Sequence, residues 1–337
     1  MRILVTGGAG YIGSVSVEAF LAAGHDVTVL DDLSTGHSAA VPKGAALEIA
    51  SYTDGPSVAH LLKRRRIDAV LHCAAKSLVG ESMVEPAKYF RENVAGGIAL
   101  LDGMREAGVN RIVFSSTAAT YGMPERTPIT ESDPIRPINA YGETKRSVEG
   151  AIRWYGHAYG LRSVILRYFN AAGASTQNGE QHQPETHLIP NVLAAAEQGR
   201  ELTLFGSDYP TPDGTCVRDY IHVEDLAAAH LLALEATDPS DVRTGPAAPA
   251  PCEPLICNLG SGTGFSNREI VTAAERVVGH PIEVKMGPRR VGDPPVLVAG
   301  AQRAGEVLHW QPRHGAIEEI IESAWKWRRL HPNGYAD

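Results

Sequence analysis

A glycine-rich turn that directly follows the first apolar run constrains this chain more than any other feature. The run ILV at residues 3–5 precedes the segment TGGAGYIGS at 6–14, and an amphipathic stretch comes next. Gly7 permits a tight turn, Gly10 lets the backbone approach a pyrophosphate, and Gly13 lets the following helix pack close to the strand. Free N–H groups at the N-terminus of that helix then face the phosphates. This order of strand, turn and helix predicts a dinucleotide-binding unit.

Two acids at the end of the next apolar run indicate which dinucleotide binds. The run VTVL at residues 27–30 ends at Asp31, and Asp32 follows. An acid about 20 residues past the glycines suits the ribose 2′-hydroxyl of NAD. The same acid would repel the 2′-phosphate of NADP, because both groups are anionic. The sequence therefore predicts NAD as the cofactor.

The segment YGETK at residues 141–145 indicates proton-transfer chemistry. Tyr141 and Lys145 lie four residues apart, so both side chains leave the same face of a helix. A phenol has a pKa of about 10 and is a poor base at neutral pH. A nearby ammonium favours the phenolate, so Lys145 is expected to lower the Tyr141 pKa. Most such pairs are a half-buried tyrosine beside a solvated lysine, and this one gains weight from the nucleotide-binding signature in the same half of the chain.

Composition excludes several classes of protein. The 337 residues carry a formal net charge of −8 and a pI near 5.9, which leaves no basic surface for nucleic acid. No apolar run approaches the roughly 18 residues of a membrane span, and we expect no signal peptide because a strand begins at residue 2. We expect a reduced, cytoplasmic protein with no metal site. The four cysteines, which lack metal-ligand spacing, are Cys73, Cys216, Cys252 and Cys257.

Apolar strands alternate with helical patterns over roughly the first half of the chain. Strands are predicted at 2–6, 26–30, 68–73, 111–115 and 163–168. Helices are predicted at 11–23, 55–66, 86–108 and 140–159. Alternation of this kind implies an α/β fold with a Rossmann-type, doubly wound parallel sheet, whose ligand lies at the carboxyl ends of the strands.

The pattern loosens in the second half, where glycine, proline and asparagine punctuate the chain. We expect an NAD-binding domain at 1–172 and a smaller mixed α/β substrate lobe at 173–337, with parts of 221–260 returning to pack on the first domain. The Pro-rich segment 238–254 is predicted to be a mobile loop. Shorter helices are predicted at 187–199, 224–236 and 267–278.

Several segments together carry a family resemblance. Four of them resemble the extended short-chain dehydrogenase/reductases: TGGAGYIGS at 6–14, FSSTAATYG at 114–122, YGETK at 141–145 and RYFNAAGA at 167–174. Three more make the chain closely similar to the UDP-glucose 4-epimerases along its whole length: GTCVRDYIHVEDLA at 214–227, NLGSG at 258–262 and RRVGD at 289–293.

The resemblance implies a role for each matching residue. Thr117 would hydrogen-bond the sugar hydroxyl and relay its proton, Tyr141 would be the base, and Lys145 would also bond the nicotinamide ribose. Phe205 would pack against uracil, arginines would bind the diphosphate and an acid the uridine ribose. The implied cofactor contacts are Gly7, Gly10, Tyr11, Ile12, Gly13, Asp31, Asp32, Ser115, Tyr141, Lys145 and Tyr168. The implied substrate contacts are Thr117, Asn170, His187, Leu188, Phe205, Arg218, Arg290, Asp293 and Leu297.

Three positions depart from the family pattern. Ser51 stands where the third strand often ends in an aspartate that binds adenine, and Asp54 is displaced from that position. Lys76 lies one residue before the position where some members carry a lysine, and we assign it no role. His187 stands where some members have asparagine, and either side chain can donate a hydrogen bond to a phosphate.

The activity that the resemblance implies is inversion of carbon 4 of a UDP-hexose, converting UDP-galactose to UDP-glucose. The route is a transient 4-keto sugar, with NAD taking and returning the hydride. The alternatives are a UDP-N-acetylglucosamine 4-epimerase of broader specificity and another NAD-dependent sugar-nucleotide enzyme. A 4,6-dehydratase would need an acid after Thr117, where Ala118 and Ala119 stand. An NAD-sensing scaffold would have no use for a proton relay.

The resemblance also bears on sugar choice and on assembly. Leu297 would border the sugar's 2-substituent, where leucine is smaller than tyrosine but bulkier than serine or cysteine. A homodimer would form as a four-helix bundle from the helices at 86–108 and 140–159 of each subunit. An intramolecular core is the equally plausible destination of the apolar stripes on these helices, which comprise Phe90, Val94, Ile98, Leu101, Val148, Ile152 and Tyr155.

Overall fold

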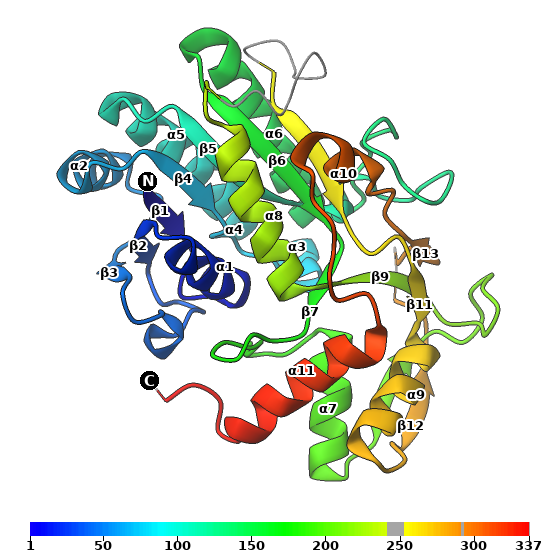
Figure 1. Cartoon of the computed structure of the whole chain (residues 1–337). Helices are drawn as coiled ribbons and strands as arrows, with labels where there is room; N and C mark the ends of the chain where they lie inside the picture. Colours follow the sequence, from blue (N-terminus) through cyan, green and yellow to red (C-terminus); the bar gives the residue numbers. More distant parts are fainter. Residues whose placement is uncertain (241–252, 291–292, 337) are drawn as a thin grey trace.

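A seven-stranded parallel sheet forms the centre of the computed structural model, which describes residues 1–240, 253–290 and 293–336 (Figure 1). The strand order is β10-β6-β5-β4-β1-β2-β3, so the chain runs outward from β1 in both directions. This confirms the predicted Rossmann-type, doubly wound α/β fold. The strands are β1 (Arg2–Thr6), β2 (Asp26–Asp31), β3 (Ala46–Ile49), β4 (Ala69–His72), β5 (Arg111–Thr117), β6 (Arg162–Tyr168) and β10 (Leu255–Leu259).

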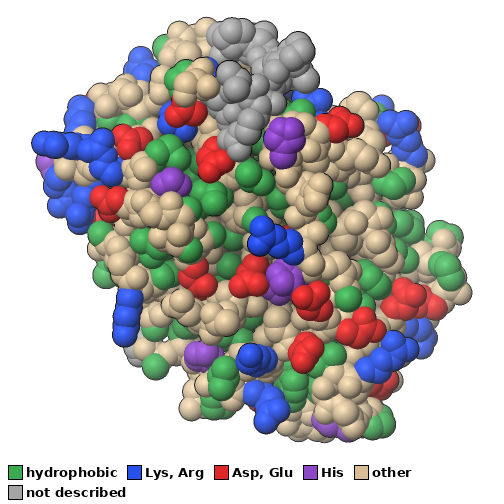
Figure 2. Space-filling view, viewed as in Figure 1, with side chains coloured by type: hydrophobic (Ala, Val, Ile, Leu, Met, Phe, Trp, Pro, Cys, Tyr) green, Lys and Arg blue, Asp and Glu red, His purple; other side chains and the backbone are tan. Residues whose placement is uncertain are grey.

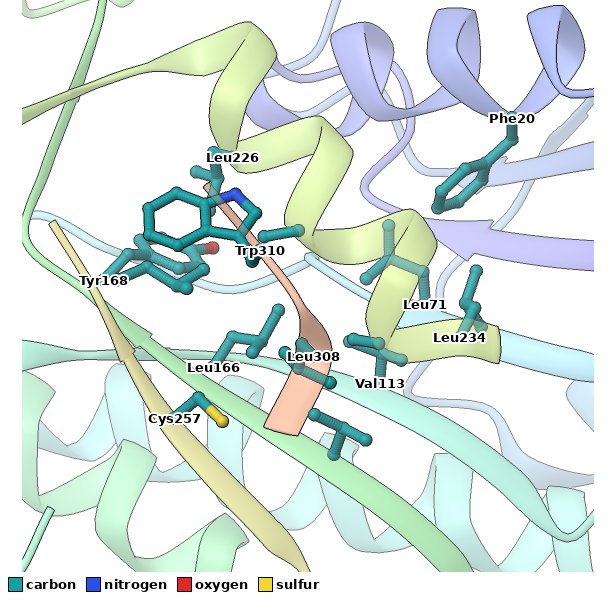
Figure 3. Packing of buried hydrophobic residues seen from close by; sticks show 14 of the residues in the cluster. Phe20, Leu71, Val113, Leu166, Tyr168, Leu226, Leu234, Cys257, Leu308 and Trp310 are labelled. Carbon is teal, nitrogen blue, oxygen red and sulfur yellow. The ribbon is translucent and has the colours of Figure 1, made fainter. Parts of the chain in front are cut away.

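Helices cover both faces of this sheet. One face packs on α1 (Tyr11–Ala22), α8 (Val223–Ala236) and α10 (Gln302–Leu308). The other packs on α2 (Gly55–Arg65), α5 (Gly96–Ala107) and α6 (Ala140–Tyr159). Figure 3 shows Trp310 beside Tyr168 and Leu226 in the first of these cores. The indole N–H of Trp310 donates to the carbonyl oxygen of Asp225 at 2.9 Å, so the buried nitrogen is satisfied.

Two elements from the second half of the chain, β10 and α8, are part of the large sheet and its helical cover. Strand β10 pairs with β6 in parallel register, with Leu255 opposite Val164, and α8 packs along α1. The large sheet therefore contains residues from both sides of the proposed boundary at 172, and that boundary stays a prediction.

The remaining elements build a second, smaller layer (Figure 1). Strand β9 (Val217–His222) lies between β11 (Gly264–Ser266) and β13 (Val296–Leu297) and also pairs with β7 (Asn170–Ala172). A separate parallel pair joins β8 (Leu202–Phe205) to β12 (Val284–Gly287). Their core is closed by α7 (Leu188–Gln198), α9 (Asn267–Val278) and α11 (Ile317–Leu330).

The helical stretch predicted at 86–108 is confirmed in its extent, although it is not one regular α-helix. The structure has α3 (Val79–Val84) before it, then α4 (Pro86–Tyr89), a π-helical turn η2 (Phe90–Ala95) and α5. A π turn adds a residue to the helical period, which an amphipathic pattern does not reveal. Short 3-10 turns also occur at η1 (Ser38–Ala40) and η3 (Ala118–Thr120).

The apolar stripes on α5 and α6 divide between the core and the surface. Leu101, Val148 and Ile152 are buried in the core beneath these helices, which is the intramolecular alternative for these three residues. Phe90 and Ile98, by contrast, are 41% and 39% exposed.

The surface charge and the character of the described helices are relevant to the expectation of no nucleic-acid or membrane partner. Lys and Arg side chains are interspersed with Asp and Glu on the face shown in Figure 2. None of the helices in residues 1–240, 253–290 and 293–336 has both the length and the apolar character that a membrane span requires. Residues 241–252, which contain most of the predicted mobile loop, lie outside the described part of the chain.

Candidate active site

The glycine turn between β1 and α1 is shaped partly by the protein and partly for a ligand. Gly7 has φ +72°, and a Cβ there would lie 2.6 Å from the nitrogen of Ala74. A Cβ on Gly13 would lie 2.1 Å from the carbonyl oxygen of Gly7. A Cβ on Gly10 would meet only that same oxygen, at 3.4 Å. Protein packing thus explains Gly7 and Gly13 but not Gly10, which is the position where close approach of a pyrophosphate favours glycine.

The acids at the end of β2 lie beside this turn. The carboxylate of Asp31 accepts hydrogen bonds from the backbone N–H of Ala9 at 3.0 Å and of Leu33 at 2.9 Å, which fix its position. Burial raises the pKa of Asp31, and these two bonds offset only part of that rise. Lys76, which has no role assigned from the sequence, donates from Nζ to the hydroxyl of Ser34 at 3.0 Å. It therefore stands at the end of the site where an NAD ribose is expected.

At the position expected to contact adenine, this chain has Ser51 in place of the aspartate that is frequent in the family. The hydroxyls of Ser51 and Thr53 are 2.8 Å apart. Asp54 is the N-cap of α2 and accepts from the backbone N–H of Ser57, so its displacement from the adenine position has a structural cause.

The start of α6 brings Tyr141 to the end of β5. Asn139 caps the helix by accepting from the N–H of Gly142 at 2.8 Å. A Cβ on Gly142 would lie 2.5 Å from the carbonyl oxygen of Ala119, so glycine lets this helix end press against the turn after β5. Thr117 and the Tyr141 phenol are thereby brought together, and Thr117 lowers the pKa of Tyr141. The structure therefore brings together Thr117 and Tyr141, two of the predicted catalytic residues, although they are 24 positions apart in the sequence.

Lys145 lies one turn further along α6, in the interior. Its Nζ donates to the carbonyl oxygen of Ser115 at 2.8 Å and lies 6.0 Å from the centre of the Tyr141 ring. Burial lowers the pKa of Lys145 to about 8, which brings its titration close to neutral pH.

The expected low pKa of Tyr141 is wrong for the protein by itself. Desolvation raises the Tyr141 pKa to about 12, and the hydrogen bond with Thr117 offsets part of the rise. The expected low pKa rested on the charge of Lys145, whereas desolvation of the phenol opposes ionisation and dominates here.

Neighbouring polar groups hold this corner in place. The hydroxyls of Ser115 and Tyr168 share a short hydrogen bond at the ends of β5 and β6. The side chain of Asn93, in the π turn η2, donates to the hydroxyl of Thr144 at 3.0 Å. The same side chain accepts from the backbone N–H of Lys76 and donates to the backbone carbonyl oxygen of Lys76. Sequence reasoning missed Asn93 because a π turn left no signal in the pattern.

A second polar group lies on the smaller layer. Arg218 on β9 is paired with Asp293 by a short ion pair, and the guanidinium of Arg290 lies 4.4 Å from the centre of the Phe205 ring. Four of the residues expected to bind the nucleotide are therefore close in two pairs. Arg290 covers one face of Phe205, so uracil packing would use the opposite face or require Arg290 to move.

Leu297 lies between the two groups. It is opposite Arg218 in the β13–β9 register and packs on a small apolar cluster that contains Ala118 and Phe169. Asn170 on β7 is fixed by donating to the carbonyl oxygen of Asp219 at 2.8 Å.

His187 and Leu188 stand at the start of α7. Leu188 is half-buried against the core of the smaller layer. His187 faces Glu180 and Glu185, whose negative charge raises its pKa well above the ordinary value, the effect of Glu180 being the largest. Tyr11 reaches the same half of the chain by donating to the carbonyl oxygen of Gly173 at 2.7 Å.

Comparisons with known proteins agree with this geometry. The model of the NAD dependent epimerase/dehydratase family matches residues 3–244. The chain is 51% identical over 338 residues to a UDP-glucose 4-epimerase of Streptomyces lividans, covering 100% of this chain and 98% of that protein. A solved structure of a UDP-glucose 4-epimerase matches with a TM-score of 0.93, 46% identity and full coverage of both chains. The Brucella ovis UDP-glucose 4-epimerase in complex with NAD matches at 43% identity and a TM-score of 0.90, covering 97% and 98% of the chains. The chain therefore belongs to the NAD dependent epimerase/dehydratase family.

Proposed function

We propose that this protein inverts carbon 4 of a UDP-hexose, interconverting UDP-galactose and UDP-glucose with NAD as its cofactor. The observation that carries the proposal is the contact of Thr117 with Tyr141, one helical turn from Lys145, at the carboxyl edge of the sheet where the glycine turn also lies. Relatives that match over their full length bear the name UDP-glucose 4-epimerase. Ala118 follows Thr117 and is buried, so no acid stands there for dehydration.

The residues of this chain would handle the proton of the 4-hydroxyl. Thr117 and Tyr141 interact, so a sugar hydroxyl that meets Thr117 can pass its proton to the Tyr141 oxygen once that oxygen is ionised. Lys145 would hold a ribose hydroxyl and add positive charge beside that oxygen when protonated. The same atoms return the proton when the opposite face of the sugar is reduced.

The residues expected to hold NAD fit that group. Gly10 offers an uncrowded backbone for the pyrophosphate, and Asp31 presents a fixed carboxylate for a ribose hydroxyl. When bound, NAD supplies the hydride acceptor and donor, so the net redox change is zero.

The nucleotide end of the substrate would be held on the smaller layer. Arg218 and Arg290 are suited to the diphosphate because guanidinium groups bind phosphate in a bidentate way. Asp293 would bind the uridine ribose, Phe205 the uracil, and His187, Leu188 and Asn170 would complete the pocket. Strong contacts at this end would retain the nucleotide while the keto sugar turns over.

The proposal is tested by supplying UDP-galactose without added NAD and following UDP-glucose. Conversion to equilibrium would support it. A product that has lost water, or no turnover by protein that carries NAD, would contradict it.

The identity of the bound cofactor is the first prediction. Because Asp31 would repel a 2′-phosphate, nucleotide released by denaturing the purified protein should be NAD. Mass spectrometry of the supernatant gives the answer directly. A majority of NADP there would disprove the assignment of Asp31.

Leu297 should set the tolerance for the sugar's 2-substituent. We expect efficient turnover of UDP-galactose and weaker turnover of UDP-N-acetylglucosamine. Leu297→Tyr should lower kcat/KM for the acetamido sugar by roughly 10–200-fold relative to UDP-galactose, the range expected for a few atoms of steric difference. Val296→Ile is the control, because alternate strand residues face opposite ways. An unchanged ratio in Leu297→Tyr would remove this residue from the sugar pocket.

We further propose a homodimer through α5 and α6. Trp154 and Tyr159 on α6 are 71% and 54% exposed, and Phe90 in η2 and Ile98 on α5 are further exposed apolar side chains. Exposed apolar groups in one region mark interaction surfaces. Light scattering at micromolar concentration should give twice the mass of one chain, and Trp154→Glu should lower it toward that of a monomer. A wild-type monomer would contradict the proposal.

A further inference from the structure

A cluster of two histidines and two glutamates lies in the loop before α7, and the proposed catalytic chemistry leaves most of it unexplained. The segment GEQHQPETH carries all four residues within eight positions. Glu180, His182, Glu185 and His187 each place a potential ligand atom within 4.8 Å of all the others. We propose that these four side chains bind a divalent transition metal ion, for which zinc is the best match.

The distances between the ligand atoms agree with a tetrahedral shell. Nδ1 of His187 lies 2.8 Å from Oε1 of Glu180 and 2.8 Å from Oε1 of Glu185. Nδ1 of His182 lies 3.3 Å from Oε1 of Glu180 and 3.8 Å from Oε2 of Glu185. Zinc bonds to nitrogen and oxygen of about 2.0–2.1 Å give a tetrahedral edge of about 3.3 Å. The four separations lie on both sides of that value.

Hydrogen bonding alone leaves this cluster incomplete. Nδ1 of His182 is buried and has no hydrogen-bond partner among residues 1–240, 253–290 and 293–336, although it lies 3.3 Å from Oε1 of Glu180. The Glu180 side chain is only 7% exposed. One N–H group can point directly at only one carboxylate oxygen, but Glu180 and Glu185 both lie 2.8 Å from Nδ1 of His187. One of these two close approaches is therefore not explained by a well-directed hydrogen bond. A cation at the centre would use a lone pair from every member, including the unpaired nitrogen.

The ligand types narrow the choice of metal. Two imidazoles with two carboxylates suit zinc and its transition-metal neighbours, whereas magnesium and calcium prefer oxygen alone. Four protein ligands form the closed shell of a structural site. Our expectation of no metal considered only the cysteines, and no cysteine is involved here.

A second group of similar composition serves as an internal contrast. His222, Glu224 and His314 also lie within 4.8 Å of one another. His222, however, accepts from the N–H of Glu224 with Nδ1 at 3.1 Å and bonds Ser323 with Nε2 at 3.0 Å. Both of its ring nitrogens are therefore already used, and this group lacks a buried donor atom without a partner.

Metal binding would also orient His187. Coordination through Nδ1 fixes the ring and leaves its other nitrogen, Nε2, as a hydrogen-bond donor. This last step rests on the proposed function, in which His187 meets the diphosphate. The metal site itself goes beyond that function and is tested without any measurement of turnover.

The experiment measures zinc on untagged, full-length protein carrying its cofactor. After incubation with zinc chloride and gel filtration, plasma mass spectrometry should find about one zinc per chain in wild type, and less than about a tenth of that in His182→Asn and Glu180→Gln. Glu224→Gln, from the second group, should retain the wild-type amount. Dipicolinate should lower the melting midpoint of wild type by about 3 °C or more and leave that of His182→Asn unchanged.

Two outcomes would overturn the proposal. Wild-type protein that retains no zinc would show that the two histidines and two glutamates form only a polar network. Equal retention by wild type and His182→Asn would place the metal elsewhere. Because UDP-galactose turnover is scored separately, neither outcome bears on whether the protein is an epimerase.

Discussion

Tyr141→Phe should reduce turnover of UDP-galactose on the order of 10²–10⁴-fold, the loss typical of a missing general base. The substitution removes the oxygen that bonds Thr117 but keeps the ring, so packing at the start of α6 is preserved. Binding of UDP, measured by calorimetry, should change little, because the nucleotide is expected on the smaller layer.

Tyr155→Phe is the matched control for this prediction. It is the same substitution on the same helix, and the Tyr155 hydroxyl donates to Asp102 on the surface at 2.8 Å. Turnover by Tyr155→Phe should stay within about twofold of wild type. The lost hydrogen bond lies on the surface, contributes about 1 kcal/mol to stability and involves none of the proposed catalytic residues. Comparable activity in the two variants would exclude Tyr141 as the base.

Glu149→Ala should lower the free energy of unfolding by about 3–5 kcal/mol, the cost of leaving a buried charge without its partner. Glu149 and Arg167 form two hydrogen bonds, at 2.5 and 2.9 Å, and their side chains are 8% and 4% exposed. Ser116 also donates to Glu149, and Arg167 donates to the hydroxyl of Tyr121. The network ties α6 to β5 and β6, so its loss would weaken the support of the catalytic corner.

A surface ion pair on the same helix provides the comparison. Arg146 lies 3.1 Å from Glu143, with side chains 52% and 37% exposed. Arg146→Ala should change the free energy of unfolding by no more than about 1 kcal/mol, because solvent screens the pair. Urea unfolding followed by circular dichroism measures both variants. Equal midpoints for Glu149→Ala and Arg146→Ala would show that the buried pair does not stabilise the fold.

Long, periodic elements of this fold could be predicted from the sequence, and short or irregular ones could not. The strand ending at Thr6 and the helix 140–159 have strong apolar patterns, and both lie within a residue or two of the prediction. The strand Ala46–Ile49 has four half-buried or exposed residues and therefore no buried run to detect. The helices that end the chain were also missed, because Pro, Gly and His interrupt the apolar pattern around them.

Contacts within the candidate site were predictable where a motif or a family resemblance supplied them. The nearness of Tyr141 to Lys145 comes from helical spacing, and that of Tyr141 to Thr117 came from the resemblance alone. The high pKa of Tyr141 depends on how completely neighbouring groups exclude water, which no local pattern encodes. The convergence of Glu180 with His182 arises from loop geometry, so a search for regular ligand spacing overlooks it.

The late position of β10 in the chain has a consequence for biosynthesis. A nascent polypeptide that has reached the end of β6 has made six strands of the large sheet, but it lacks the strand that pairs with β6 and the helix that packs on α1. Its sheet ends in an unpaired edge, and one apolar face lacks the cover of α8 and Trp310. Such edges and faces promote association between chains. Most of the chain must therefore be synthesised before the large sheet is complete. Until then, folding depends on factors that prevent incomplete chains from associating with one another.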